Sequence, residues 1–303
     1  MTAATPTVSL PPRQVWMLAI RPRTLPAALS PIIVGLAFAI QAGEGSIPIA
    51  LVTVAVSLLL QIAANLANDL SDFSRGADVH RLGPPRVTQL GLVSPGAMRK
   101  AIGVVLAAAV LLGLLLVVHG GWPIALAGVA SLLAALAYTG GPYPLAYHGL
   151  GEAAVALFFG GVGVLGTVYL QLDEIPAAAW AAAAGVAALA AMILVVNNLR
   201  DLATDAAAGK RTLAVRLGER GTVIEYRLLL AVAFGMPILM TIVDRSHIGW
   251  LAVWLIAPRA WSLSQRVATT RGPALNPVLG ATAKLGLWYA IALAGGIILE
   301  RWL

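Results

Sequence analysis

Residues 101–147 read AIGVVLAAAVLLGLLLVVHGGWPIALAGVASLLAALAYTGGPYPLAY and contain no Asp, Glu, Lys or Arg. A helix that spans a membrane needs about 20 predominantly apolar residues, so this run is long enough for two spans. Gly120-Gly121-Trp122-Pro123 lies near its middle, and Gly and Pro are the residues that most often interrupt a helix. The run therefore predicts two transmembrane helices joined by a short turn.

The rest of the chain repeats this pattern. Uncharged runs also cover residues 24–43, 45–68, 153–172 and 175–199, and shorter ones cover 228–243, 246–258 and 285–299. Of all residues, 59% are hydrophobic and 11% are charged, whereas a soluble domain carries about 25% charged residues. The sequence predicts an all-α integral membrane protein with about nine transmembrane helices in one bundle, forming a single domain over residues 1–303.

The basic residues are distributed unevenly between the two sides of the predicted membrane. With nine spans, one side receives the N-terminal arm and the loops 69–100, 139–152, 200–227 and 259–284. That side carries 18 of the 20 Lys and Arg residues, and only Arg245 and Arg301 lie on the other. The positive-inside rule predicts that the N-terminus and these loops are cytoplasmic, in the cell (plasma) membrane. The net charge of +7 is thereby explained without a nucleic-acid partner, and the absence of Cys excludes disulfides and thiolate chemistry.

Two clusters of Asn and Asp follow two of the apolar runs. In the first, Asn68 and Asp72 are four residues apart, so both project from one face of a helix. The second cluster repeats this spacing once more, as an i, i+4, i+8 ladder. The first cluster contains Asn65, Asn68, Asp69 and Asp72, with Asp78 further on, and the second contains Asn197, Asp201 and Asp205. The two clusters enter from the same side, as a parallel internal repeat requires.

Carboxylate and amide oxygens are the ligands that Mg²⁺ prefers, and this ion usually completes its shell with phosphate and water. Facing each other, the clusters could hold two Mg²⁺ ions bridged by a diphosphate. The candidate metal ligands are Asn68, Asp69, Asp72, Asn197, Asp201 and Asp205. The candidate catalytic residues are Asp72, Asp78, Asp201 and Asp205.

Basic residues surround both clusters, as an anionic ligand would require. Arg binds phosphate oxygens in pairs and Lys supplies a compact charge. The candidate diphosphate-binding residues are Arg75, Arg81, Arg86, Lys210 and Arg211. Charged residues at helix ends are also common as ordinary interfacial solvation, but two ladders of the same spacing on the same side favour a functional site.

The remaining polar residues give weaker signals. We interpret Glu152, Asp173 and Glu174 as ordinary loop charges. Tyrosines at helix ends usually anchor a helix at the membrane interface. Tyr138, Tyr143 and Asn65 are nevertheless the candidates for contact with an aromatic substrate.

The sequences Asn68-Asp-x-x-Asp72 and Asn197-x-x-x-Asp201-x-x-x-Asp205 resemble the two signatures of the UbiA superfamily of intramembrane prenyltransferases. Residues 81–86, 138–143, 149–152 and 209–218 are similar to the branch that acts on 1,4-dihydroxy-2-naphthoate, and the likeness covers roughly residues 20–300. The wider superfamily often has an Asp four residues after the position of Asp72. This chain has Gly76 there, and Asp78 is the candidate to take that part.

This resemblance implies a nine-helix bundle with a central cavity open to lipid, and Mg²⁺-dependent transfer of a prenyl group. The metal and basic groups would stabilise the departing diphosphate, and exclusion of water would protect the allylic cation. The ring of 1,4-dihydroxy-2-naphthoate would attack that cation at carbon 2 and lose its carboxylate, giving demethylmenaquinone. The implied partners are polyprenyl diphosphate, 1,4-dihydroxy-2-naphthoate, Mg²⁺ and the lipid bilayer.

Two other functions fit parts of the sequence. Another member of the superfamily would use a different acceptor, such as 4-hydroxybenzoate, homogentisate or a chlorin. A membrane transporter could use the carboxylates as an ion site, but a transporter is expected to place ionisable residues near the middle of the bilayer. Here they gather at one membrane face, which favours the enzyme.

Overall fold

The computed structural model of the chain describes residues 10–76 and 82–302, and every regular element in these residues is helical. The α-helices are α1 (Pro12–Ile20), α2 (Leu25–Ala42), α3 (Ile47–Ser74), α4 (Pro95–Ala137), α5 (Gly151–Val155), α6 (Gly166–Leu172), α7 (Ala177–Ala207), α8 (Leu213–Val243), α9 (Ala257–Thr269) and α10 (Leu275–Leu299). The 3₁₀ segments are η1 (Pro22–Thr24), η2 (Leu145–His148), η4 (Arg245–Ile256), η5 (Gly272–Ala274) and η6 (Glu300–Trp302), and η3 (Ala156–Leu165) is a π-helix.

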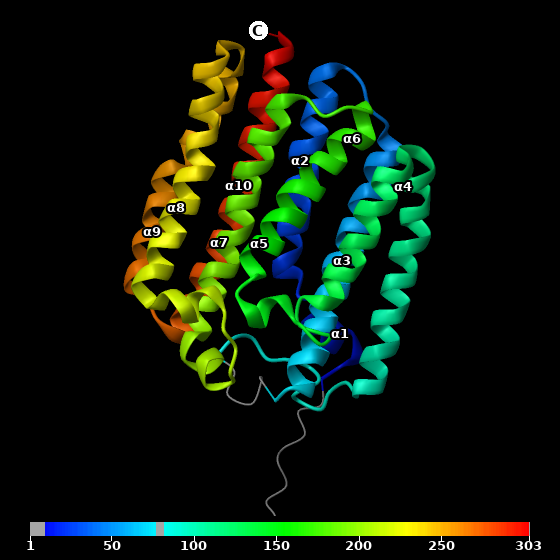
Figure 1. Cartoon of the computed structure of the whole chain (residues 1–303), viewed down its shortest axis with the longest axis vertical. Helices are drawn as coiled ribbons and strands as arrows, with labels where there is room; N and C mark the ends of the chain where they lie inside the picture. Colours follow the sequence, from blue (N-terminus) through cyan, green and yellow to red (C-terminus); the bar gives the residue numbers. More distant parts are fainter. Residues whose placement is uncertain (1–9, 77–81, 303) are drawn as a thin grey trace, which may run out of the picture.

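Seven helical stretches in the described residues are long and apolar enough to cross a membrane. The longest, α4, turns back on itself at Gly121, whose φ of 68° lies in the left-handed region that glycine tolerates. Figure 1 shows the two antiparallel arms of α4, so the turn predicted within residues 101–147 is confirmed. The C-terminus lies at the opposite end of the bundle from α1, as an odd number of crossings requires (Figure 1). The count of nine spans stays a prediction.

The predicted loops at 200–227 and 259–284 are mostly helical, and this part of the prediction was wrong. α7 continues to Ala207, α8 begins at Leu213, α9 reaches Thr269 and α10 begins at Leu275. The sequence reading ended each helix where charges begin, but a helix that extends past the apolar layer can carry charged side chains at its end. Both Asn/Asp ladders therefore lie on helices, at the ends of α3 and α7.

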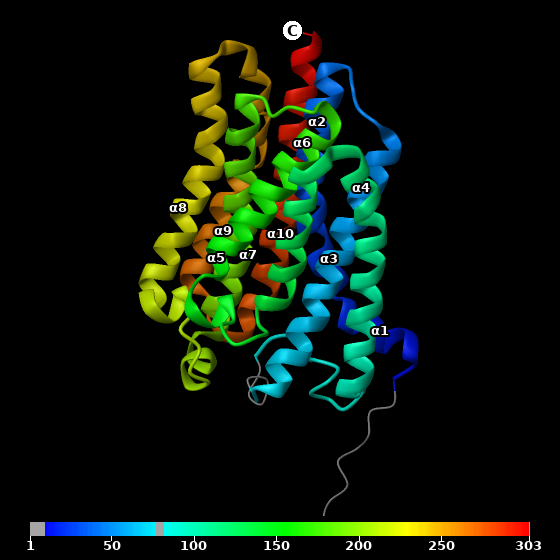
Figure 2. The same cartoon turned by 45° about the vertical axis from the view of Figure 1, so that its right-hand side comes forward.

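The core of the bundle surrounds α7 and α10. In two views these helices lie between α8 and α9 on one side and α3 and α4 on the other (Figure 1, Figure 2). Small residues allow close approach: a Cβ added at Gly160 of η3 would lie 2.4 Å from the Cβ of Ala187 on α7. Such contacts matter in a membrane, where packing rather than the hydrophobic effect holds helices together. The polar ends of α3 and α7 meet at one end of this rigid bundle, beside the connections 138–150 and 208–212 (Figure 1).

Candidate active site

The polar end of α3 buries three of its predicted site residues, Asn65, Asp69 and Asp72. Asn65 donates through Nδ2 to the carbonyl oxygen of Ile20 at 2.8 Å and to Thr24 Oγ1 at 2.9 Å, so it fixes the junction between α1 and α2. In this structure Asn65 thereby ties α3 to the segment that joins α1 and α2, and its contact with an aromatic substrate stays a prediction.

Asp69 fixes the segment that follows α3. Its Oδ2 accepts the backbone N–H of Val87 and its Oδ1 that of Thr88, both at 3.2 Å. Because the side chain is 1% exposed, these hydrogen bonds replace the water that a carboxylate would otherwise require. Asp69 thereby holds Arg86, the neighbour of Val87, over the end of α3.

Asp72 lies at the centre of the site. Its Oδ2 accepts from Arg86 Nη2 at 2.6 Å, and its Oδ1 accepts from the Tyr147 hydroxyl at 2.8 Å. Lys210 Nζ stands 3.5 Å from the same Oδ1. Asp72 is 2% exposed, and this set of donors from three distant segments stabilises its charge in the interior.

Asp205, near the end of α7, faces Asp72 across Lys210. The lysine Nζ is 3.5 Å from Asp205 Oδ1 as well as from Asp72 Oδ1. The end of α7 positions Lys210, because the helix finishes in a Schellman motif. The N–H of Gly209 (φ 74°) donates to the carbonyl of Ala206, and the N–H of Lys210 donates to the carbonyl of Asp205 at 2.9 Å. The two predicted clusters therefore meet at one ammonium group.

Asp201 and Asn197, the other members of the second ladder, contact a buried arginine. Arg200 Nε donates to Asp201 Oδ1 at 2.8 Å, and Arg200 Nη2 donates to Asp201 Oδ2 at 2.5 Å. The same Nη2 also donates to Asn197 Oδ1 at 2.8 Å. Arg200 Nη1 reaches Asn276 Oδ1 at 2.9 Å, and Asn276 in turn donates to the carbonyl of Leu82 at 3.3 Å. In this structure the guanidinium group holds both residues and ties α7 to α10 and to the segment after α3.

The remaining predicted residues differ in how close they come to the site. Asn68 accepts a hydrogen bond from Thr139 Oγ1 at 2.7 Å and lines the cavity described below. Arg75 is exposed, donates to the carbonyl of Gly141 at 2.6 Å and lies over the Tyr147 ring. Arg211 is exposed, and its backbone pairs with that of Tyr147. Asp78 and Arg81 lie outside the described residues.

Among the aromatic residues, Tyr147 rather than Tyr143 faces the carboxylates. Tyr143 is 57% exposed and stacks on His148 at 3.7 Å between ring centroids. The Tyr147 ring lies 4.7 Å from Lys210 Nζ and 5.2 Å from Arg75 Cζ, both cation–π contacts. Tyr147 was not among the predicted substrate contacts, because the sequence does not separate it from Tyr138 and Tyr143 at the same helix end.

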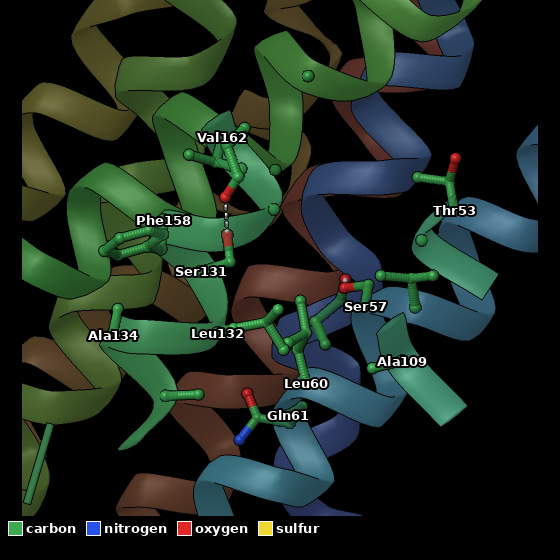
Figure 3. Close-up of a pocket in the computed structure, with 18 of the residues that line it drawn as sticks. Thr53, Ser57, Leu60, Gln61, Ala109, Ser131, Leu132, Ala134, Phe158 and Val162 are labelled. Atoms are coloured by element: carbon green, nitrogen blue, oxygen red, sulfur yellow. Dashed lines mark hydrogen bonds between the residues drawn. The ribbon is translucent and has the colours of Figure 1, made fainter. Parts of the chain in front are cut away.

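Tyr138 connects the charged site with an apolar cavity. Burial, followed by the charges of Glu152, Asp72 and Asp205, raises the pKa of the Tyr138 hydroxyl. The cavity has a volume of about 510 Å³ and lies between α2, α3, α4 and the η3 region. Tyr138 and Asn68 line it near the charged site, and Figure 3 shows Gln61, Ser57 and Thr53 following one another along α3 away from that site.

The arrangement suits an anion better than a bare metal ion. No group of three or more His, Cys, Asp and Glu side chains within residues 10–76 and 82–302 is placed to hold a metal. Two carboxylates do flank Lys210, and carboxylate oxygens are hard donors that fit Mg²⁺ when phosphate and water complete its shell. The donor set therefore fits Mg²⁺ that arrives with a phosphate ligand.

The fold and the site define a multi-pass helical membrane protein with a charged site at one end of an apolar cavity. Residues 28–288 match the UbiA prenyltransferase family, and the chain belongs to that family. The relatives include 1,4-dihydroxy-2-naphthoate octaprenyltransferase of Mycobacterium tuberculosis, 41% identical over 93% of this chain and 96% of that protein. The protein of the same name from Escherichia coli is 35% identical over 95% of this chain and 96% of its own.

A human relative, UbiA prenyltransferase domain-containing protein 1, is 31% identical over 94% of this chain and 83% of its own. Among solved structures, a UbiA homolog from Archaeoglobus fulgidus bound to GPP and Mg²⁺ superposes with a TM-score of 0.66 at 16% identity, covering 92% of this chain and 99% of that one. At that identity the match shows a shared fold.

Proposed function

We propose that this chain transfers a polyprenyl group from polyprenyl diphosphate to 1,4-dihydroxy-2-naphthoate, with loss of the ring carboxylate, giving demethylmenaquinone in its reduced (quinol) form. The family and the names of relatives at 35–41% identity support the reaction and the acceptor. The single observation that carries the proposal in the structure is the meeting of Asp72 and Asp205 at Lys210, beside an apolar cavity.

The charged end of the site suits the diphosphate. Lys210 and Arg86 are the cations placed against the carboxylates, and Arg75 lies nearby on the Tyr147 ring. Arg81 and Arg211 complete the proposed set; the side chain of Arg211, like that of Arg75, is exposed. Fixed cations stabilise the negative charge that develops on a departing diphosphate, which is where electrostatic catalysis is most effective.

Mg²⁺ is the proposed cofactor, held by Asp72 and Asp205 with Asn68 beside them and with Asp78 as a further candidate. When bound, the ion would neutralise the diphosphate oxygens and make the group a better leaving group. Asp69, Asn197 and Asp201 remain candidate ligands, but in this structure their oxygens accept from Val87, Thr88 and Arg200. Their first role is therefore to hold the segments that carry the site.

The apolar cavity suits the isoprenoid tail. The lining residues of α3 extend from Asn68 to Thr53, and at about 1.5 Å of rise per residue this distance is roughly 22 Å. An apolar wall also keeps water from the allylic cation, which would otherwise be quenched. Tyr138 stands where cavity and charged site meet, so the ring of the acceptor is expected beside it.

The orientation in the membrane is part of the proposal. The connections that carry the site lie at the end of the bundle that holds 18 of the 20 Lys and Arg residues in the predicted topology. We place this end and the N-terminus in the cytoplasm, in the cell membrane, because the positive-inside rule favours it. A soluble acceptor would then reach the site from the cytoplasm and the prenyl donor from the bilayer, with the whole chain acting as one domain.

The acceptor is the part of the proposal that needs the first test. Purified protein is incubated with Mg²⁺, a polyprenyl diphosphate and either 1,4-dihydroxy-2-naphthoate, 4-hydroxybenzoate or homogentisate, and the products are identified by mass. We expect a prenylated product from the naphthoate alone. Products from 4-hydroxybenzoate instead would contradict the acceptor but agree with the family, and no product from any acceptor would contradict prenyl transfer.

A further inference from the structure

Glu152 is a buried carboxylate that the proposed diphosphate site does not use. It is the second residue of α5 and is 8% exposed, so the interpretation of Glu152 as an ordinary loop charge was wrong. Its Oε1 accepts a hydrogen bond from Asn198 Nδ2 on α7 at 2.7 Å. Its Oε2 is buried and has no hydrogen-bond partner in the described part of the chain. Asp173 and Glu174, which were interpreted in the same way, are exposed.

Glu152 belongs to the short helix α5 that borders the charged end of the cavity, although its own side chain is not among the lining residues. Ala154 and Val155, in the same short helix, line the cavity, and so does Tyr138. The Tyr138 hydroxyl would lie 3.1 Å from a Cβ placed on Gly151, the residue before Glu152. Tyr138 is also the group on which the charges of Glu152, Asp72 and Asp205 act together. Glu152 and the diphosphate site therefore approach the same tyrosine.

The surroundings of Glu152 indicate what it can bind. The partner of its bound oxygen is the neutral amide of Asn198, whereas Asp72 and Asp205 both face cations. A carboxylate oxygen is only an acceptor, and a buried one is expected to be hydrogen-bonded. An anionic diphosphate would be repelled here, but a phenolic hydroxyl group would supply the missing donor.

We propose that Glu152 is a catalytic residue for the aromatic acceptor: its Oε2 accepts a hydrogen bond from a ring hydroxyl, and Asn198 positions the carboxylate. This inference rests on the proposed function. Under this proposal the two substrates contact separate residues: Lys210 and Arg86 bind the diphosphate, and Glu152 contacts the aromatic ring.

The proton balance of the reaction fits this role. The C1–O bond of the prenyl diphosphate breaks and its electron pair leaves with the diphosphate, and the ring carbon that bears the carboxylate then bonds to C1 of the allylic cation. The ring hydroxyl loses its proton to Glu152 and becomes a carbonyl. When the bond to the carboxylate breaks, CO₂ departs, the electron pair returns to the ring oxygen, and Glu152 returns the proton to it. No other reactant is needed.

The test compares Glu152→Gln with Glu174→Gln, the same substitution at an exposed position just after α6. For Glu152→Gln we expect kcat with 1,4-dihydroxy-2-naphthoate to fall about 100-fold or more, as loss of a general base usually does. The Kd for prenyl diphosphate should stay within about twofold in both variants. Glu152→Asp should recover part of the rate, and Asn198→Ala should raise KM for the acceptor about tenfold.

A second arm begins with wild-type protein, so its first comparison needs no variant. The two mono-methyl ethers of the naphthoate each lack one hydroxyl proton, and wild-type protein should reject one of them strongly. Glu152→Gln should no longer distinguish that ether from the parent acceptor. Equal turnover of both ethers by wild type, or unchanged acceptor kinetics in Glu152→Gln, would overturn the role of Glu152. Wild-type protein that does not prenylate the naphthoate at all would instead overturn the proposed function.

Discussion

Asp72 of α3 and Asp205 of α7, 133 positions apart in the chain, share the ammonium group of Lys210, which stands 3.5 Å from a carboxylate oxygen of each. Two buried carboxylates repel each other unless a cation lies between them. The bundle therefore brings together two negative side chains and holds them apart by one positive group.

Asp72→Asn and Asp205→Asn should each lower Mg²⁺-dependent turnover by about 100-fold or more, because each removes a negatively charged metal-ligand candidate from the site. Both variants keep the shape of the side chain and should elute as folded protein in detergent. Asp173→Asn is the matched control, since Asp173 is exposed and its left-handed backbone (φ 57°) suits Asn. Near-normal turnover in either site variant would make that residue an ordinary helix-end charge.

Asp201→Ala should act mainly on stability. Its carboxylate is paired with Arg200, whose side chain is 1% exposed, and breaking a buried ion pair typically costs about 3–5 kcal/mol. We expect a clearly lower melting temperature in detergent for Asp201→Ala than for Asp205→Ala, measured side by side. A melting temperature equal to wild type for Asp201→Ala, together with lost turnover, would contradict this expectation and support Asp201 as a metal ligand.

Lys210→Gln should weaken binding of prenyl diphosphate about tenfold or more and leave binding of the aromatic acid nearly unchanged. The substitution removes the cation between Asp72 and Asp205 and leaves their repulsion at the place where the diphosphate is expected. Arg211→Gln is the comparison, because its exposed side chain should contribute less than about threefold. Direct binding of both ligands in detergent measures this, and equal diphosphate affinity in wild type and Lys210→Gln would contradict the assignment.

The orientation can be tested in intact cells because the chain has no cysteine of its own. Ser94→Cys and Ala208→Cys introduce thiols at the end that carries the site, and Ser246→Cys introduces one at the opposite end. A thiol reagent that does not cross the membrane should label only Ser246→Cys from outside the cell. External labelling of Ala208→Cys would reverse the orientation, and labelling of Ser94→Cys and Ser246→Cys from the same side would contradict an odd number of crossings between them.

The spacing of four residues was enough to predict which faces of α3 and α7 carry the site, because that spacing follows from helix geometry alone. The turn in α4 was also predictable, because Gly and Pro interrupt a helix through their own local backbone geometry. Long-range contacts were not predictable: the ion pair of Arg200 with Asp201 looks in sequence like two ordinary charges, and the link from Arg200 to Asn276 spans 76 positions.

Burial at the ends of helices was equally hidden. Glu152 and Glu174 bracket the same apolar run in the sequence, yet one is enclosed against Asn198 and the other is exposed. Only the packing of α5 against α7 separates them. Asp69 illustrates a related limit, because its oxygens accept backbone N–H groups of a segment whose path no residue pattern specifies.

The central claim is that the chain joins a polyprenyl group to 1,4-dihydroxy-2-naphthoate with loss of the ring carboxylate. The most direct measurement uses the naphthoate labelled at its carboxyl carbon, with purified protein, polyprenyl diphosphate and Mg²⁺. We expect labelled CO₂ to appear only when all components are present, in a 1:1 ratio to a prenylated product that carries no label. A prenylated product that retains the label, or turnover of 4-hydroxybenzoate but not of the naphthoate, would contradict the claim.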